Sequence, residues 1–221
     1  MYSHRWINGK ETGLATGKAV CIGRNYVDHA KELNNPIPDE PVLFIKPATS
    51  IVGTDSPLEL SGRLAPIHYE AELSVLISKP LTNAKREEVL KAVVGVGIAL
   101  DLTRREAQSK LKEKGLPWEL AKAFDGSCVQ SPFVSFEGID LAATTYGLDI
   151  NGEATQCGDT RLMINPVVDL ICHLTQYFTL VPGDIVLTGT PKGVGKLTDG
   201  DKLTLTLSNE VLAEFNCVAV A

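Results

Sequence analysis

Several features that define other protein classes are missing from this sequence. No apolar run could cross a bilayer, since the longest, AVVGVGIAL, covers only residues 92–100. The N-terminal stretch MYSHRWINGKETG lacks the apolar core of a signal peptide, and no lysine- and arginine-rich cluster appears. The net charge of −6 does not suit a nucleic-acid-binding surface. We therefore expect a cytoplasmic protein that binds neither membranes nor nucleic acid.

The cysteines form no recognisable pattern. There are five of them, an odd number, and no two are spaced as C-x-x-C. Scattered cysteines of this kind indicate a reducing compartment and structural roles for the thiols. Thiolate metal sites are therefore not expected.

The common nucleotide-binding and hydrolase motifs are also absent. GTPKGVGK has five residues between Gly189 and Gly195, where a phosphate-binding loop needs four, and Leu197 replaces the required serine or threonine. GVGIAL lacks the third glycine of a dinucleotide fingerprint. Neither G-x-S-x-G nor H-E-x-x-H occurs. Any chemistry must therefore come from another arrangement of residues.

What is present suits one domain of the α+β class. The chain has 221 residues, 44% of them hydrophobic, which is enough for a real core. Patterning predicts strands over 18–23, 41–47, 69–77 and 94–101, helices over 27–33, 103–115 and 166–178, a hairpin turn at Asn151-Gly152, and three strands in the tail. Thr103 and Glu106 read as a capping box for the second helix, and Gly115 as its stop. Because strands dominate the end without regular interleaving by helices, mixed and largely antiparallel sheets are favoured.

The stretch HYEAEL (68–73) places two acids in a predicted strand. Alternation puts Glu70 and Glu72 on one face, about 7 Å apart, while apolar residues take the other face. Two such acids repel each other and resist desolvation. Their pairing needs an explanation, either exposure to solvent or a bound cation.

Asp101 extends this acidic group. On its predicted strand it shares a face with Gly95 and Gly97, small residues that allow either close packing of another segment or a cavity. If a cavity is present, Glu70, Glu72 and Asp101 face into it. Carboxylates without histidine or cysteine suit a hard cation, Mg²⁺ or Mn²⁺. Ordinary solvated acids are the alternative.

Cationic and basic side chains could complete such a site. An anionic substrate would need positive charge, and the candidates are Arg24, Lys46 and Lys122, although each one taken alone fits an ordinary surface cation better. His29 and Glu32 lie three residues apart on a predicted helix and so face the same way. A carboxylate beside an imidazole raises its basicity, which is how a general base is built; a simple surface contact is the alternative.

Taken together, these segments resemble the fumarylacetoacetate hydrolase family, most closely its small single-domain branch that acts on acylpyruvates and oxaloacetate. The matching stretches run in order from about residue 19 to 201: CIGRNYVDHAKE, PVLFIKP, HYEAEL, ALDLTRREAQ, PWELAKAFDGS, NGE, MIN and PGDIVLTGTPKGVG. Each one is a weak signal, but the ordered set is specific.

The resemblance implies a β-roll with short flanking helices, usually dimeric. It implies Mg²⁺ or Mn²⁺ held by Glu70, Glu72 and Asp101. It also implies a His29–Glu32 dyad on a mobile lid, with Lys122 reaching into the site. The positions that usually line the ligand pocket are Arg24, Asn25, Gln108 and Thr190. Thr155, where the family usually carries arginine, and Val129, where it often carries proline, depart from the pattern and bear on the choice of substrate.

The implied activity is metal-dependent cleavage of the C–C bond of acylpyruvates by water, through an enolate of pyruvate. The alternative is an oxaloacetate reaction, either decarboxylation or keto–enol tautomerisation, or isomerisation of a 2-hydroxy-diene-dioate. A non-catalytic binding module would have no use for the His29–Glu32 dyad, so we favour an enzyme acting on a small 2-oxo acid as a homodimer. We divide the chain into an N-terminal extension, 1–18, and a catalytic domain, 19–221.

Overall fold

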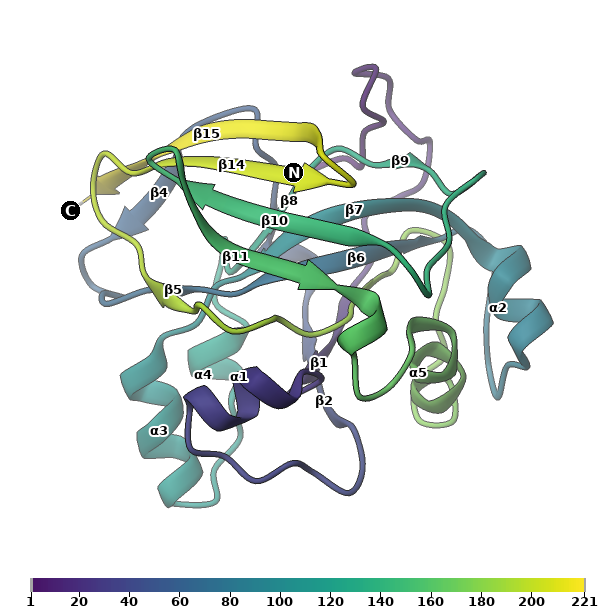
Figure 1. The fold of residues 1–221 in the computed structure, drawn as a ribbon, viewed down its shortest axis with the longest axis horizontal. Helices are drawn as coiled ribbons and strands as arrows, with labels where there is room; N and C mark the ends of the chain where they lie inside the picture. Colours follow the sequence, from purple (N-terminus) through teal and green to yellow (C-terminus); the bar gives the residue numbers. More distant parts are fainter. Residues whose placement is uncertain (1, 221) are drawn as a thin grey trace.

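Two stacked sheets form the framework of the computed structural model, which describes residues 2–220 (Figure 1). The larger sheet has eight strands in the order β2-β1-β12-β6-β7-β8-β3, with β9 paired to β7. Its strands are β1 (Ala19–Gly23), β2 (Val42–Lys46), β3 (Ile51–Val52), β6 (Ala71–Ile77), β7 (Val93–Asp101), β8 (Cys128–Gln130), β9 (Val134–Ser135) and β12 (Ile185–Leu187).

The second sheet has five strands in the order β11-β10-β14-β15-β4, and it lies across β6 and β7 (Figure 1). Its strands are β4 (Leu58–Ser61), β10 (Thr145–Ile150), β11 (Glu153–Asp159), β14 (Lys202–Leu207) and β15 (Glu210–Val220). A short ladder joins β5 (His68–Tyr69) to β13 (Gly195–Lys196). The pairs β1–β12, β3–β8 and β4–β15 are parallel and the other ladders antiparallel, which confirms the mixed, largely antiparallel α+β class.

The helices are short and gather at two places. Figure 1 shows α1, α3 and α4 together beside one part of the sheets, and α2 and α5 beside another. The helices are α1 (Val27–Glu32), α2 (Arg86–Ala92), α3 (Arg105–Glu113), α4 (Glu119–Lys122) and α5 (Val167–Leu174), with 3₁₀ turns at Ala48–Ser50 and Thr160–Leu162. Within residues 2–220, no helix has the length and apolar character needed to span a membrane.

The larger sheet is covered on both faces, so its central strands are buried throughout. Every residue of β6 is buried. Val75 packs into the main core shared with the five-stranded sheet, whereas Leu76 packs into a smaller cluster on the opposite face. The N-terminal segment covers that opposite face, where Trp6 bridges to Phe133. The division of the chain at residue 18 stays a prediction.

The glycines beside Asp101 are explained by close packing. A Cβ on Gly97 would lie 2.8 Å from Gln130 Nε2, and one on Gly95 would lie 3.1 Å from both Trp6 and Phe133. The first of the two explanations offered by the sequence is therefore correct for these positions, because other segments fill the space above them.

Two local predictions were wrong. The strand expected over 69–77 is interrupted at Glu70, which lies between β5 and β6. The capping box is absent, since α3 begins at Arg105 with Arg104 at the cap position. The Thr103 hydroxyl instead donates to Asp101 O at 3.2 Å. The Asn151-Gly152 hairpin turn is confirmed, with φ of 55° and 84° between β10 and β11.

Candidate active site

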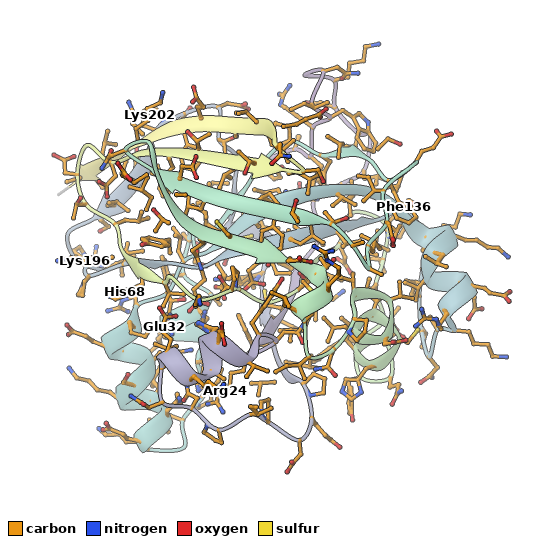
Figure 2. All side chains as sticks on the ribbon, in the orientation of Figure 1. Arg24, Glu32, His68, Phe136, Lys196 and Lys202 are labelled. Carbon is orange, nitrogen blue, oxygen red and sulfur yellow. The ribbon has the colours of Figure 1, made fainter. Side chains whose placement is uncertain are left out.

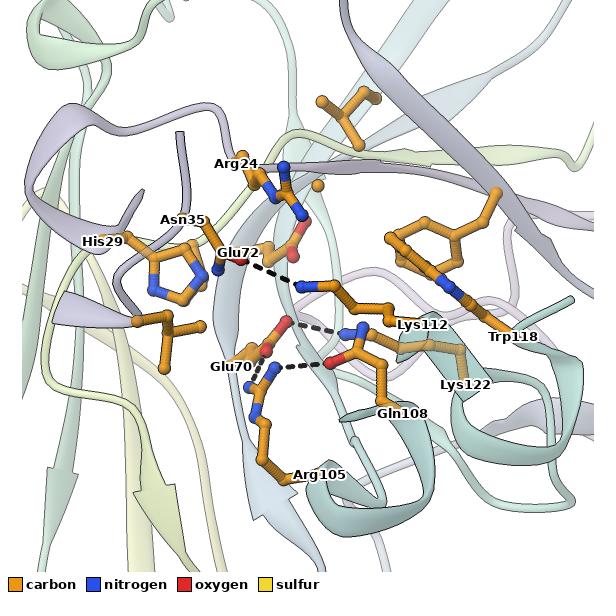
Figure 3. A pocket seen from close by; sticks show the side chains of 15 residues that line it. Arg24, His29, Asn35, Glu70, Glu72, Arg105, Gln108, Lys112, Trp118 and Lys122 are labelled. Carbon is orange, nitrogen blue, oxygen red and sulfur yellow. Dashed lines mark hydrogen bonds and ion pairs between the residues drawn. The ribbon is translucent and has the colours of Figure 1, made fainter. Parts of the chain in front are cut away.

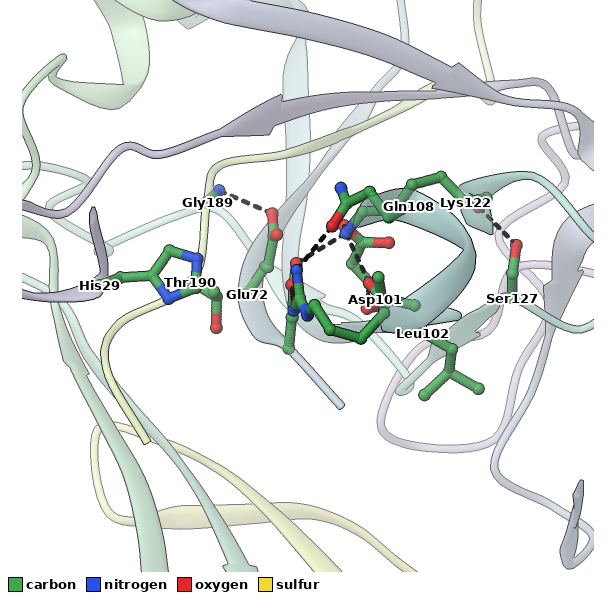
Figure 4. A network of polar contacts seen from close by, with 12 residues as sticks. His29, Glu72, Asp101, Leu102, Gln108, Lys122, Ser127, Gly189 and Thr190 are labelled. Atoms are coloured by element: carbon green, nitrogen blue, oxygen red, sulfur yellow. Dashed lines mark hydrogen bonds and ion pairs between the residues drawn. The ribbon is translucent and has the colours of Figure 1, made fainter. Parts of the chain in front are cut away.

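Three buried carboxylates meet where β6 and β7 run side by side. Glu70 immediately precedes β6, Glu72 lies within it, and Asp101 ends β7. The antiparallel register pairs Ala71 with Leu100, which brings the two strand ends together. One oxygen from each acid lies within 4.8 Å of the others. The sequence-predicted triad is therefore assembled as one cluster; Figure 3 shows Glu70 and Glu72, and Figure 4 shows Glu72 and Asp101.

Glu72 is the least neutralised of the three acids. It is 1% exposed, and the backbone N–H of Gly189 donates to its Oε2 at 2.6 Å. No ion pair to Glu72 occurs within residues 2–220. Burial, followed by repulsion from Asp101 and Glu70, raises its pKa well above the usual range for a glutamate. A buried carboxylate in this environment calls for additional positive charge.

Glu70 and Asp101 are instead paired with cations. Lys122 Nζ donates to Glu70 Oε2 at 2.8 Å and to Asp101 Oδ2 at 2.5 Å, and Arg105 also donates to Glu70. Burial alone would raise the pKa of Glu70, but the charges of Lys122 and Arg105 outweigh it and hold the pKa well below its usual range. The same acids keep Lys122 charged, because their attraction exceeds the effect of burial and raises its pKa.

Lys46 lies behind the triad. Its side chain is fully buried, and Nζ lies 2.8 Å from Asp101 Oδ1 and donates to Ser127 Oγ at 3.1 Å. It also donates to the carbonyl of Lys122. Because Lys46 does not line the pocket, it holds Asp101 and the end of α4 in place instead of meeting a substrate.

The donor set fits a divalent cation. Three carboxylates converge, and one of them has no cationic partner within residues 2–220 despite complete burial. Oxygen-only donors are the ligands of hard divalent ions, and a bound ion would remove the repulsion that raises the pKa of Glu72. Glu70, Glu72 and Asp101 are the residues that would hold it.

His29 and Glu32 form the predicted contact on α1, with His29 Nδ1 and Glu32 Oε2 3.4 Å apart. Glu32 is anchored in turn, because Gly193 N donates to its Oε1 at 3.0 Å. Burial lowers the pKa of His29, and the nearby Glu70 and Glu32 offset this only in part. The imidazole is therefore neutral near pH 7, the state that a general base requires.

A narrow pocket joins these groups and encloses about 40 Å³ of free space. Its lining includes the predicted residues Arg24, His29, Glu70, Glu72, Gln108, Lys122 and Thr190, together with Phe44, Trp118 and others. Such a volume holds only a few water molecules. We therefore expect side chains or the α1 segment to move when a larger ligand binds.

Two residues expected to line the pocket make other contacts. Asn25 is completely buried and away from the lining; its amide donates to Thr188 O at 2.8 Å, and its oxygen accepts from Asn165 N at 2.8 Å. Thr190 does line the pocket, but its hydroxyl donates to Ala71 O at 2.8 Å. Because a hydroxyl has only one donor, Thr190 has none left for a substrate oxygen. Both side chains therefore hold neighbouring backbone segments in place through these hydrogen bonds.

Sequence reasoning missed Arg105, Lys112 and Asn35, all of which line the pocket. Arg105 Nη1 donates to Gln108 Oε1 at 2.7 Å, and Lys112 lies four residues further along α3. The spacing of three and then four residues places Arg105, Gln108 and Lys112 along one helix face. This three- and four-residue spacing of polar side chains is visible in the sequence and could have predicted that they face the same side.

The two departures from the family pattern lie away from the pocket lining. Thr155 is on β11, where its hydroxyl donates to Glu153 O at 3.0 Å. Val129 is buried on β8 and pairs with Val52. Neither substitution changes the lining directly.

Comparison with known proteins identifies the family. The sequence of residues 18–217 matches the fumarylacetoacetate hydrolase C-terminal family. The oxaloacetate tautomerase YcgM of Escherichia coli strain K12 is 46% identical over 215 residues, which cover 96% of this chain and 98% of that protein.

Solved structures agree with this assignment. A fumarylacetoacetate hydrolase family protein from Yersinia pestis CO92 superposes with a TM-score of 0.95 at 44% identity, covering 98% of this chain and all of the other. A fumarylpyruvate hydrolase from Pseudomonas aeruginosa in complex with Mn²⁺ and pyruvate gives a TM-score of 0.87 at 32% identity, covering 99% and 95%. The chain therefore belongs to the fumarylacetoacetate hydrolase family and is an enzyme of that family.

Proposed function

We propose that this enzyme is an oxaloacetate tautomerase that interconverts the keto and enol forms of the substrate. The observation that carries the proposal is 46% identity to an oxaloacetate tautomerase across nearly the full length of both chains. The sequence alone had ranked acylpyruvate hydrolysis first and the oxaloacetate reactions second. The comparisons favour the reverse order.

The reaction moves one proton from C3 to the oxygen on C2. The neutral His29 supplies a base on the pocket wall, and Glu32 orients its ring through Nδ1. The charged Lys122 lines the pocket and places positive charge beside a substrate oxygen, while its three N–H donors contact Glu70, Asp101 and Thr103. A divalent cation held by Glu70, Glu72 and Asp101 would act as a Lewis acid for charge developing on the C2 oxygen.

We propose Mg²⁺ or Mn²⁺ as the cation. The all-carboxylate donor set favours a hard ion, and the solved fumarylpyruvate hydrolase neighbour holds Mn²⁺. The substrate is a small 2-oxo acid, and we retain the expected homodimer and cytoplasmic location as part of the proposal.

A second candidate is hydrolysis of acylpyruvates. It is favoured by one observation, the match to a fumarylpyruvate hydrolase along 99% of this chain. In that reaction His29 would deprotonate water instead of carbon, so the same residues would serve both activities.

The decisive experiment gives the Mg²⁺-loaded protein enol-oxaloacetate, acetylpyruvate and fumarylpyruvate in parallel. Loss of the ultraviolet absorbance of the enol measures tautomerisation, and pyruvate release measures cleavage. Buffer with the same Mg²⁺ corrects for uncatalysed reactions. We expect accelerated tautomerisation and slower cleavage. Cleavage of either acylpyruvate without accelerated tautomerisation would replace the proposal with the second candidate.

A further inference from the structure

Two positive side chains at the pocket mouth have no acidic partner in the part of the chain that the structure describes. Arg24 is half-buried and makes no side-chain hydrogen bond or ion pair there. Lys112 is exposed and donates to Asn35 Oδ1 at 2.9 Å. The deeper cations, Lys122 and Arg105, both contact Glu70. The mouth therefore carries positive charge that the protein itself does not neutralise.

The side chains of Arg24 and Lys112 line the same pocket although they come from different elements. Arg24 lies in the loop between β1 and α1, and Lys112 in the last turn of α3. Both line the pocket, and Figure 3 shows both pointing toward the region of Glu70 and Glu72. Burial and the charges of Arg24 and then Arg105 lower the pKa of Lys112, which agrees with this proximity.

The backbone holds Arg24 in an uncommon conformation. Its φ is +62°, in the left-handed region that residues with a Cβ seldom adopt. The neighbouring Asn25 fixes this turn through hydrogen bonds to Thr188 O and Asn165 N. Figure 2 shows Arg24 and Glu32 beside α1. Strained residues of this kind are enriched at ligand-binding sites.

The charge balance of the pocket favours a dianion. Arg24, Arg105, Lys112 and Lys122 line it with two glutamates, and Asp101 completes the triad. Four positive side chains therefore face three carboxylates, and a divalent ion in the triad would leave three positive charges in excess. A dicarboxylate neutralises more of this excess than a monocarboxylate of the same length.

We propose that Arg24 and Lys112 form a subsite for the distal carboxylate of a dicarboxylic 2-oxo acid. The inference rests on the proposed function, because the 2-oxo acid end of the ligand must occupy the triad. A guanidinium offers five donors and an ammonium three, of which Asn35 occupies one. The subsite selects dicarboxylates over monocarboxylates that the same triad would accept.

Binding of two stable ligands tests the subsite without turnover. Malate and 2-hydroxybutyrate both offer a 2-hydroxy acid, and they differ at C4, where malate has a carboxylate and 2-hydroxybutyrate a methyl group. Calorimetric titration would compare them on Mg²⁺-loaded wild type, Arg24→Met and Lys112→Met. Lys110→Met, on the same helix but exposed and away from the lining, is the matched control.

We expect wild type and Lys110→Met to bind malate more tightly than 2-hydroxybutyrate by about tenfold. Lys112→Met should reduce this preference about threefold, since the side chain is exposed, and Arg24→Met about fivefold or more. Affinity for 2-hydroxybutyrate should change less than twofold. Asn35→Ala, which removes the contact to Lys112 but keeps the charge, should preserve the preference.

Equal binding of both ligands by wild type, or equal losses for both in the variants, would overturn the subsite. Loss of the malate preference in Asn35→Ala would show that Lys112 acts by holding the loop, which also overturns it. If the protein prefers malate but does not tautomerise oxaloacetate, the proposed function is refuted and the subsite stands.

Discussion

At the residue scale, catalysis is expected to depend on a neutral His29. His29→Gln removes the base, and we expect tautomerisation to fall by about 10²- to 10⁴-fold with Mn²⁺ affinity unchanged. Glu32→Gln should have a milder effect, because it weakens the base without removing it. Steady-state rates at equal metal occupancy measure both. A His29→Gln enzyme of wild-type rate would assign the proton transfer to another group.

The pH dependence follows from the same residue. Burial lowers the pKa of His29 below its usual value of 6.5. The imidazole should therefore stay neutral, and the reaction rate should stay constant, as the pH falls to somewhat below 6.5. The rate then falls as pH drops through the lowered pKa and the ring becomes charged. Glu32 raises this pKa, so Glu32→Gln should move the acidic limb to lower pH. A shift to higher pH would contradict the dyad.

The three carboxylates can be tested by metal affinity alone. Glu70→Gln, Glu72→Gln and Asp101→Asn each remove a charged oxygen donor, so each should weaken Mn²⁺ binding in a titration. Glu59→Gln, an exposed acid on β4, is the control. Unchanged affinity in all three variants would refute the metal assignment.

At the element scale, the segment from Val27 to Asn35 is expected to act as a lid. Exposed polar contacts hold much of it, including Lys192 Nζ to Asp28 Oδ2 at 3.2 Å and the Lys112–Asn35 bond. Since His29 and Asn35 of this segment line a pocket with only about 40 Å³ of free space, we expect the segment to move when substrate binds. Amide exchange there should be fast without ligand and slow with oxalate and Mg²⁺. Equally slow exchange in both states would contradict the lid.

The turn after β12 depends on a glycine. Gly189 has φ of +97°, a Cβ there would lie 2.6 Å from Asn25 Cβ, and its N–H donates to Glu72. Gly189→Ala should therefore lower the free energy of unfolding by roughly 2 kcal/mol or more and weaken Mn²⁺ binding. Gly126→Ala is the matched control, because its φ of +75° is similar but no atom lies within 4 Å of the added Cβ. If both variants lose the same free energy of unfolding in denaturant titrations, the loss comes from the positive φ alone and the contact with Asn25 contributes nothing.

At the scale of the whole molecule, we expect a homodimer. β2 forms an edge of the larger sheet, and its residues line an apolar groove of about 620 Å³ with Trp118 and Phe178. Edge strands with apolar surroundings are usually covered in folded proteins. Light scattering after size exclusion should give twice the chain mass of 23.8 kDa. A monomer at micromolar concentration would contradict the expectation.

The sequence by itself determined the α+β class, most of the elements and the carboxylate cluster. These rest on local rules: alternation in β6 and β7, the Asn151-Gly152 turn, and the three-residue spacing of His29 and Glu32. The order of matching motifs added the family, which the comparisons confirm.

Only the tertiary structure decided which of the candidate cations meet the pocket. Lys46, Lys122 and Arg24 look alike in the sequence, yet Lys46 is buried behind Asp101, Lys122 bridges two acids, and Arg24 faces the mouth. Long-range packing sets these differences, since β2, α4 and the loop after β1 meet only in the folded chain. The same holds for Asn25 and Thr190, whose hydrogen bonds to distant backbone groups leave no mark in local sequence.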